Sequence, residues 1–156
     1  MGIKSFQGKR EVHKGAENAQ FLVSDYMTKK LVTFKPDDSL DDVIHLLIAH
    51  KISGGPVVND KNELIGIISE TDCIKHISES KYYNMPSDSG NNVAKKMITN
   101  VDTIYKDMNI FDAATKFINS KRRRFPVVEN GKLIGQISQK DVLKAALNIR
   151  GNTWKK

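Results

Sequence analysis

The chain has 156 residues, of which 39% are hydrophobic, so it can form one compact core or two small halves but not two large domains. The longest apolar stretch, residues 43–49, contains a histidine and is far shorter than the roughly 20 residues that cross a bilayer, so we expect no membrane span. The formal net charge of +7 indicates an anionic partner: a nucleic acid, an anionic membrane surface or a phosphorylated small molecule.

Two further features of the sequence bear on the cellular compartment. The N-terminus lacks the apolar centre and the cleavage pattern of a secretory signal. A single cysteine, Cys73, rules out an intramolecular disulfide. Both features fit a reducing compartment, and we expect a cytoplasmic protein.

The predicted elements begin after residues 1–20, which are polar and without a sustained period and predict a tail that folds only against a partner. A short helical lead-in containing Met27 and a strand-like stretch at residues 31–33 come next. Apolar residues spaced i, i+3, i+4, i+7 and i+8 then predict an amphipathic helix, with Ser39 as its N-cap: Leu40, Val43, Ile44, Leu47 and Ile48. A strand, a polar turn, a return strand and a second helix follow at residues 56–58, 59–63, 64–69 and from 70 onward.

The same order of elements returns 70 positions later, which indicates an internal duplication. Residues 101–103 are again strand-like, and Asn109 is the N-cap of a helix with the same apolar spacing: Ile110, Ala113, Ala114, Phe117 and Ile118. The next strand begins at Pro126, and its turn is one residue shorter, so the return strand at residues 133–138 is offset by 69. A change of length confined to a turn is what a duplicated fold tolerates.

The duplication divides the chain into two motifs, at residues 21–78 and 93–149, with a C-terminal tail at residues 150–156. Residues 79–92 contain proline, serine, glycine and asparagine and predict a linker. One motif of about 60 residues buries too little surface to be stable alone, so we expect the two motifs to pack face to face.

The sharpest local signal is a glycine, a serine and an aspartate at the end of each return strand. Residues 66–72 read Gly-Ile-Ile-Ser-Glu-Thr-Asp, and residues 135–141 read Gly-Gln-Ile-Ser-Gln-Lys-Asp. Glycine lets another group approach the strand, a serine at a helix start with its free N–H groups receives phosphate, and the aspartate can hold ribose hydroxyls. An ordinary N-cap with an acidic first turn has the same pattern, so both interpretations stay open.

A basic run, residues 121–124, precedes the second Pro-Val-Val strand. The planar fork of an arginine suits phosphate, whereas a solvated helix end stabilised by the helix dipole is the alternative. The first motif has no cation at the positions equivalent to the three arginines of this run, which are Ile52, Ser53 and Gly54, so phosphate sites in the two motifs should be unequal.

Catalytic machinery is missing from the sequence pattern. The histidines lack metal-ligand spacing, and Cys73 is more typical of a small core residue than of a nucleophile. There is no Ser-His-Asp order, Walker loop or dinucleotide fingerprint. We therefore expect neither an enzyme nor a metal site.

These motifs together resemble a tandem pair of cystathionine-β-synthase (CBS) domains, over residues 21–149. The resemblance rests on the Pro-Val-Val strand, the Ile-Gly strand and the Gly-x-x-Ser-x-x-Asp ending, each present in both copies. It implies an α/β fold of the α+β type, in which two βαββα motifs form a pseudo-twofold disc with two ligand clefts.

The resemblance also implies ligands and site residues. Similar clefts hold AMP, ADP, ATP or S-adenosylmethionine, with no obligatory cofactor. The family's phosphate and ribose contacts correspond to Ser69, Asp72, Ser138 and Asp141. Its adenine contacts correspond to Val32, Thr33 and Gly55 in the first copy and to Asp102, Thr103 and Phe125 in the second. Basic residues before the proline, here Arg123 and Arg124, reach phosphates in similar proteins.

Two departures from the family pattern distinguish the copies. Gly54 and Gly55 replace a bulkier pair, which predicts a looser adenine slot in the first copy, and Phe125 predicts a tighter one in the second. We therefore expect the second motif to carry the better site.

The expected function is that of a regulatory module that binds an adenine nucleotide, senses cellular energy or adenosyl ligands, and signals to a regulated partner protein by conformational change. The resemblance further implies a homodimer. The alternative is a structural or nucleic-acid-interacting module whose clefts are vacant and whose basic surface binds. Nucleotide binding should be lost in Asp141→Ala, whereas charge-driven binding should survive that change and weaken steeply with salt.

Overall fold

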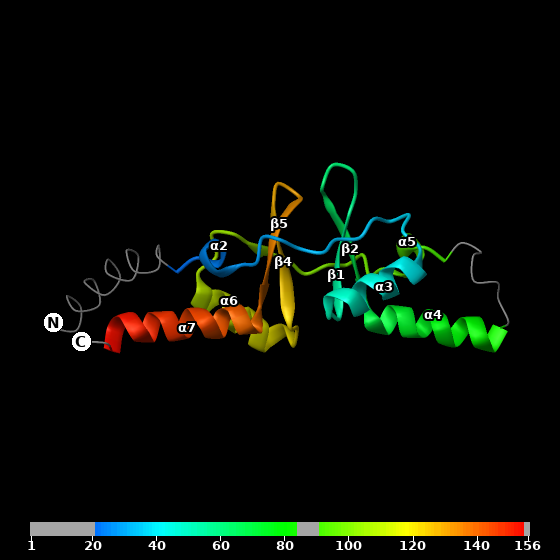
Figure 1. The fold of residues 1–156 in the computed structure, drawn as a ribbon. Coiled ribbons are helices and arrows are strands. Elements are labelled where there is room, and N and C mark those ends of the chain that lie inside the picture. The colour runs from blue at the N-terminus through cyan, green and yellow to red at the C-terminus, as the bar shows by residue number, and fades with distance from the viewer. Residues whose placement is uncertain (1–20, 84–90, 155–156) are drawn as a thin grey trace. The chain divides into compact units, whose positions relative to one another are not determined.

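The computed structural model describes residues 21–83 and 91–154 of the chain (Figure 1). These residues form two compact units. Unit 1 contains residues 21–29, 103–129 and 134–154, and unit 2 contains residues 30–83, 91–102 and 130–133. Each unit is therefore built mainly on one copy of the repeat but takes a lead-in segment from the other copy.

Unit 2 is built on the first copy. Its helices are α3 (Leu40–His50) and α4 (Glu70–Tyr83), its strands are β1 (Gly54–Val58) and β2 (Leu64–Ser69), and the short helix α5 (Val93–Lys96) comes from the second copy. The two strands are antiparallel, with Gly54 opposite Ser69, and Phe34 forms a parallel bridge to Val57. Its hydrophobic core consists of Phe34, Leu40, Val43, Leu47, Val57, Ile68, Cys73 and Val93.

The bounds of α3 follow from single residues at its ends. The Ser39 hydroxyl oxygen accepts a hydrogen bond from the Asp42 N–H at 3.1 Å, as the sequence predicts for an N-cap. The C-cap residue is Lys51, whose φ of 54° lies in the left-handed region, which costs a non-glycine residue about 1–2 kcal/mol. Between these ends, one helix face buries Leu40, Val43 and Leu47, which confirms the predicted period.

Unit 1 is built on the second copy. It contains α2 (Val23–Tyr26) from the first copy, then β3 (Ile104–Tyr105), α6 (Ile110–Ser120), β4 (Arg124–Glu129), β5 (Lys132–Ser138) and α7 (Gln139–Trp154). The first two residues of β5 belong to unit 2. The strands form a sheet in the order β3-β4-β5, and β3 runs parallel to β4 with Ile104 opposite Val127. Its buried core consists of Val23, Ile104, Ile110, Ala113, Phe117, Phe125, Val127, Ile137 and Ala145.

The glycine of each return strand is explained by the exchanged lead-in segments. A Cβ on Gly66 would lie 2.6 Å from the Met97 sulfur, and a Cβ on Gly135 would lie 2.7 Å from the Met27 sulfur. In unit 2, backbone hydrogen bonds between Ile67 and Ile98 join the return strand to the lead-in segment beside the glycine. The sequence does not identify the group that approaches each glycine. In the structure this group is a methionine side chain together with the carbonyl of the next residue.

Four predicted bounds are wrong. Residues 31–33 and 101–103 form no strand, and pairing begins one residue later at Phe34 and Ile104, whose side chains are the first of these segments to be fully buried. Helix α4 continues to Tyr83, five residues into the predicted linker, because residues 79–83 contain no helix breaker and Glu79 pairs with Lys96 on α5 at 2.6 Å.

Helix α7 likewise continues to Trp154 through the predicted C-terminal tail. Gly151 lies inside this helix and does not end it. The predicted N-terminal tail, residues 1–20, and residues 84–90 of the predicted linker lie outside the described residues.

Candidate functional site

The end of β2 meets the start of α4 at Ser69, and Asp72 folds back onto this junction. The Asp72 carboxylate oxygen Oδ2 accepts two hydrogen bonds, from the Ser69 N–H and from the Ser69 hydroxyl, both at 2.9 Å. Asp72 is 8% exposed. The aspartate therefore caps the helix start, and the Ser69 hydroxyl proton is used within the protein.

The equivalent junction of β5 and α7 is arranged differently. The Asp141 carboxylate accepts the Ser138 N–H at 2.9 Å, and the Ser138 hydroxyl oxygen accepts the Asp141 N–H at 3.1 Å. This reciprocal pair is a capping box. Because the Ser138 hydroxyl acts as an acceptor here, its own proton remains able to donate to a ligand. In both junctions the aspartate accepts these hydrogen bonds through Oδ2, and no donor among the described residues is hydrogen-bonded to Oδ1.

The segment before each Pro-Val-Val strand lies beside the adjoining helix start. The Glu70 N–H donates to the Ser53 carbonyl at 2.8 Å, and the Gln139 N–H donates to the Arg123 carbonyl at 3.1 Å. The first amide of each helix is therefore already satisfied, so each helix start offers fewer N–H groups to an anion than the sequence suggested.

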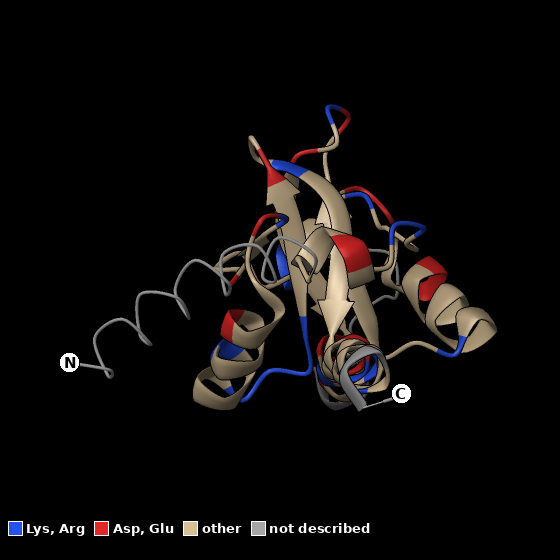
Figure 2. Ribbon diagram, turned by 90° about the vertical axis from the view of Figure 1, so that its left-hand side faces the viewer, with Lys and Arg blue, Asp and Glu red and all other residues tan. Residues whose placement is uncertain are grey.

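Basic residues reach this region in unit 1. The Gln139 side-chain amide donates to the Arg122 carbonyl at 2.9 Å, which fixes the main chain of the basic run next to α7. Arg123 is exposed and Arg124 is half-buried at the start of β4. Figure 2 shows the basic segment that connects α6 to β4. The main chain of Arg123 thus lies beside the start of α7, next to the Ser138–Asp141 junction.

The predicted adenine contacts of the first copy meet at one edge of unit 2. A Cβ on Gly55 would lie 3.0 Å from the Val32 carbonyl oxygen and 2.9 Å from the Phe34 ring. Thr33, which lies between Val32 and Phe34 in the sequence, is half-buried. The glycine is therefore needed for close packing, and the looser slot expected here from Gly54 and Gly55 is occupied by Phe34 and the Val32 carbonyl.

The corresponding edge of unit 1 carries Thr103 and Phe125. Phe125 is fully buried, with its ring 4.7 Å from that of Phe117, so a ligand can reach this residue only through its main chain. The tighter slot expected from its side chain is therefore not formed by the ring. Asp102, the residue before Thr103, is half-buried and is the last residue of its segment of unit 2.

Sequence reasoning missed Lys116 on α6. Its ammonium donates a hydrogen bond to the Thr103 carbonyl at 2.7 Å and lies 5.2 Å from the centre of the Phe125 ring. The signal was available, because the position equivalent to Lys116 in the first copy is an aliphatic residue, Leu46.

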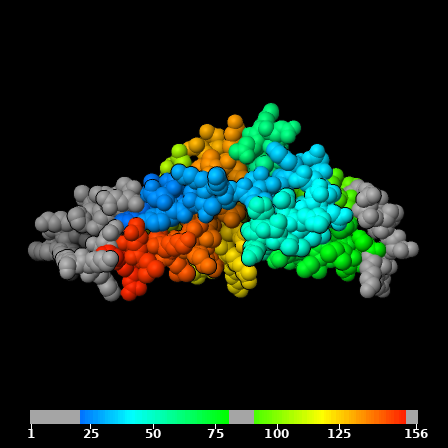
Figure 3. All heavy atoms as spheres, viewed as in Figure 1, coloured from blue at the N-terminus to red at the C-terminus, as the bar shows by residue number. Residues whose placement is uncertain are grey.

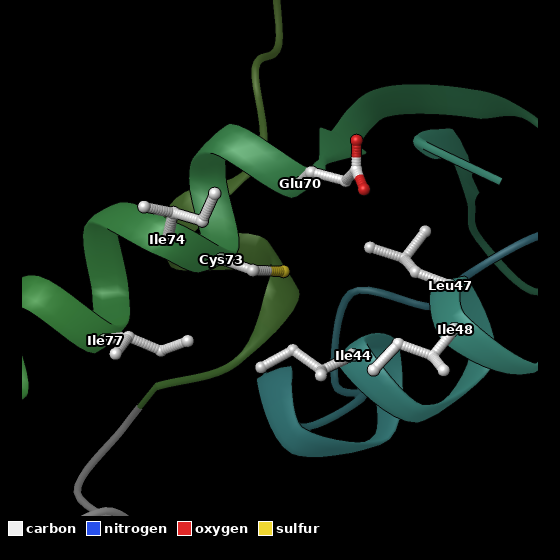
Figure 4. A pocket seen from close by; sticks show the side chains of 7 residues that line it. All are labelled: Ile44, Leu47, Ile48, Glu70, Cys73, Ile74 and Ile77. Atoms are coloured by element: carbon white, nitrogen blue, oxygen red, sulfur yellow. The ribbon is translucent and has the colours of Figure 1, made fainter. Parts of the chain in front are cut away.

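Unit 2 also holds an apolar cavity of about 170 Å³ between α3 and α4, which lie side by side on the surface (Figure 3). Its walls are Ile44, Leu47, Ile48, Glu70, Cys73, Ile74 and Ile77, with the Cys73 sulfur directed toward α3 (Figure 4). Burial raises the pKa of the Cys73 thiol, and the carboxylates of Asp72 and Glu70 raise it further. The thiol is therefore protonated at neutral pH, as suits a core residue rather than a nucleophile.

Two absences hold for residues 21–83 and 91–154. No cluster of histidine, cysteine, aspartate or glutamate in this part of the chain has the grouping of a metal site. None of the helices described there is both long enough and apolar enough to span a bilayer.

Comparison with known proteins identifies the duplicated unit. Residues 23–79 and residues 92–148 each match the CBS domain family. The chain belongs to the CBS domain family. The fold class predicted from the sequence, a mixed α/β fold with two CBS motifs, is confirmed by this match and by solved structures of CBS pairs.

Three relatives illustrate the match. The CBS domain-containing protein CBSX2 of Arabidopsis thaliana, named as chloroplastic, is 32% identical over 163 residues, which cover 88% of this chain and 68% of CBSX2. A crystal structure of CBSX2 in complex with AMP has a TM-score of 0.74 at 33% identity and covers 83% of this chain and 98% of that one. The uncharacterized protein MJ1426 of Methanocaldococcus jannaschii is 32% identical and covers 81% of this chain and 91% of its own.

A more distant structure shares the fold alone. The CBS domain pair of protein MJ0100, in complex with 5-methylthioadenosine and S-adenosyl-L-methionine, has a TM-score of 0.67 at 24% identity and covers 82% of this chain and 97% of that one. Adenosine derivatives are thus bound by two of these relatives.

Proposed function

We propose that the chain is a non-catalytic regulatory module that binds an AMP-type nucleotide, with its better site in unit 1. The observation that carries the proposal is the Ser138–Asp141 junction: a serine hydroxyl that keeps its proton, a carboxylate with one oxygen uncommitted, and an exposed Arg123 in the segment bonded to the same helix start. CBSX2, which is 33% identical in its AMP complex, supports the choice of ligand.

Each group at this junction has a role that its chemistry suits. The Ser138 hydroxyl and the Arg123 guanidinium donate hydrogen bonds, and Arg123 adds positive charge, so together they suit phosphate oxygens. The remaining Asp141 carboxylate oxygen accepts hydrogen bonds from ribose hydroxyls. The base then lies toward Thr103 and the main chain of Phe125.

The unit 2 site is proposed as the weaker of the two. Its serine hydroxyl already donates to Asp72, and the residue at the position of Arg123 is Ser53, so the site has no counterpart of this arginine. We propose that AMP, ADP or ATP fills unit 1 first, with S-adenosylmethionine as the other adenosine ligand to test.

The module is proposed to act as a homodimer in the cytoplasm and to signal to a regulated protein. Each unit leaves large apolar side chains more than half exposed on its helix pair, namely Ile48, Ile74 and Ile77 in unit 2 and Ile118, Leu143 and Leu147 in unit 1. Apolar surface of this kind marks interaction sites. Analytical ultracentrifugation should show a dimer for the unmodified chain and a monomer for Ile74→Asp, whereas equal masses would contradict this interface.

A second function is favoured by the basic run. Lys121, Arg122 and Arg123 are all exposed, and clustered basic side chains bind the backbone of nucleic acids. In this alternative, RNA or DNA binding weakens steeply with salt and does not depend on Asp141.

Isothermal titration calorimetry distinguishes the two functions. AMP, ADP, ATP and S-adenosylmethionine are titrated into the full chain and into Asp141→Ala and Asp141→Asn, of which the second retains an acceptor for the Ser138 N–H. The control is Asp112→Ala, which removes an acidic residue from the first turn of α6. Saturable binding that both Asp141 variants weaken at least about tenfold, and the control does not, supports the proposal. A folded chain that takes up none of the four ligands would overturn it.

A further inference from the structure

The helix pair of unit 2, α3 and α4, has an apolar groove at its surface. This groove is the cavity of about 170 Å³ whose walls are mostly isoleucine and leucine side chains (Figure 4). Ile74 and Ile77 of α4 line it and remain 63% and 54% exposed. An apolar cavity of roughly 150 Å³ can hold a molecule the size of benzene, so the groove has room for the end of an aliphatic side chain.

The helix pair of unit 1, α6 and α7, presents aliphatic side chains of this kind. Leu143 and Leu147 are 65% and 67% exposed, and their spacing of four residues places them on one face of α7. The corresponding residues of the first copy are Ile74 and Ser78. The two helix pairs therefore share an origin in the duplication but differ in the shape of their apolar faces.

The two helix pairs also carry opposite formal charge. Helices α3 and α4 contain five acidic and two basic residues, a formal charge of −3. Helices α6 and α7 contain two acidic and four basic residues, a formal charge of +2. Glu70 is one of the residues that line the groove, and the exposed Lys140 lies three residues before Leu143 on the same face of α7. The opposite charges thus reach the apolar faces themselves.

A second copy of the chain can join these faces in two ways, which differ in their electrostatics. If each face meets its own counterpart, the two acidic faces lie together and the two basic faces lie together, and like charges across an interface oppose association. If the groove meets the α7 face of the second copy, opposite charges lie together and exposed leucines meet an apolar cavity. Charge and shape therefore favour the same arrangement, in which unlike faces meet.

We propose that the chain associates with a second copy through these unlike faces, so that the groove between α3 and α4 of one copy receives Leu143 and Leu147 of the other. The inference rests on the homodimer of the proposed function and names the surfaces that meet in it.

The test uses one variant of each face. Ile74→Asp places a charge at the groove, and Leu143→Asp places one on the opposing face; both side chains are exposed, so the core is left intact. Sedimentation measures association of each chain alone and of an equal mixture, and circular dichroism checks folding. Ile77→Asp and Leu147→Asp replace a variant that does not fold. Ile98→Asp is the matched control, because this isoleucine is 52% exposed and lies outside both helix pairs.

The mixture gives the decisive result. In either variant alone, every contact between unlike faces contains an altered face, so we expect a dissociation constant at least about tenfold above those of the unmodified chain and of Ile98→Asp. In the mixture, the unaltered α7 face of the Ile74→Asp chain meets the unaltered groove of the Leu143→Asp chain, so association should return. Association of the unmodified chain should also weaken between about 0.05 and about 0.5 M NaCl, because salt screens the opposite charges.

Contacts between like faces give the opposite result, because each variant alone then keeps one unaltered contact and the mixture keeps none. A mixture that associates no better than its components, a control that dissociates as the variants do, or association that strengthens with salt overturns the pairing of unlike faces. Each of these results leaves the homodimer and nucleotide binding standing. An unmodified chain that stays monomeric overturns this inference together with the homodimer, whereas calorimetry decides nucleotide binding separately.

Discussion

Replacing the glycine of each return strand by alanine tests the exchange of lead-in segments between the copies. In Gly66→Ala the new Cβ would stand 2.6 Å from the Met97 sulfur and 3.0 Å from the Ile98 carbonyl oxygen. In Gly135→Ala it would stand 2.7 Å from the Met27 sulfur and 3.0 Å from the Thr28 carbonyl oxygen. Both distances lie below ordinary van der Waals contact, so a neighbour must move in each unit.

The size of the stability loss depends on which neighbouring groups can move. A methionine side chain is flexible and yields, but the Ile98 carbonyl is held by the hydrogen bond from the Ile67 N–H at 2.9 Å and by the reciprocal bond at 2.8 Å. Overpacking costs about 1–3 kcal/mol, and each weakened hydrogen bond costs about 0.5–1.5 kcal/mol. We expect Gly66→Ala and Gly135→Ala each to lower the free energy of unfolding by about 2–3 kcal/mol.

Urea unfolding followed by circular dichroism measures these losses, and double-mutant cycles assign the partners. Adding Met97→Ala should relieve part of the loss in Gly66→Ala, and Met27→Ala should relieve part of the loss in Gly135→Ala, by about 1 kcal/mol each beyond additivity. The crossed combinations, Gly66→Ala with Met27→Ala and Gly135→Ala with Met97→Ala, should be additive.

The control is Gly151→Ala within α7, where a Cβ would meet no atom within 4 Å. This change should stabilise the chain by about 0.5–1 kcal/mol through helix propensity. Coupling in the crossed combinations, with none in the predicted ones, would show that each copy keeps its own lead-in segment and would refute the exchange.

Three other predictions concern stability. Lys51→Gly should raise the thermal midpoint through a gain of up to about 1 kcal/mol, because glycine adopts the left-handed φ of 54° without strain; a lower midpoint would contradict this. Ser39→Ala should cost about 1 kcal/mol in urea unfolding through loss of the cap on the Asp42 N–H, and a cost below 0.3 kcal/mol would argue against that cap. The raised pKa of Cys73 means that the folded chain keeps a thiol proton that the unfolded chain loses above about pH 8.5, so stability should fall as pH rises beyond that value, and less so in Cys73→Ala.

Local patterns predicted the regular elements because helix and strand periods are properties of neighbouring residues. The bounds of α3, α6, β1 and β2 agree with the predicted segments to within two residues. The exchange of lead-ins escaped prediction, because Met27 and Met97 stand at equivalent positions and either pairing with the two glycines satisfies the sequence equally well. The ends of α4 and α7 were missed because composition alone assigned polar residues to a linker or a tail.

The residues of the candidate site were proposed from the sequence, whereas their hydrogen bonding is given only by the structure. Sequence alone left a helix cap and a ligand site as alternatives for Ser138 and Asp141, and the structure shows that a cap is present in both units. A cap and a site are compatible, because capping uses one carboxylate oxygen and leaves the other. Phe125 shows another limit, since its ring is buried in the core, which its place in the sequence did not indicate.

The positions at which the two copies differ are more informative about function than the positions at which they are the same. Duplication copies caps and sites alike, so the repeated Ser-x-x-Asp pattern cannot separate the two. The second copy, however, has Lys116, Arg123 and Phe125 where the first has Leu46, Ser53 and Gly55. One of these changes, Arg123, adds a cation in the segment that is hydrogen-bonded to the adjoining helix start, where an anion is favoured. A cap does not need this cation, and a phosphorylated ligand can use it, so the difference favours nucleotide binding over a purely structural role.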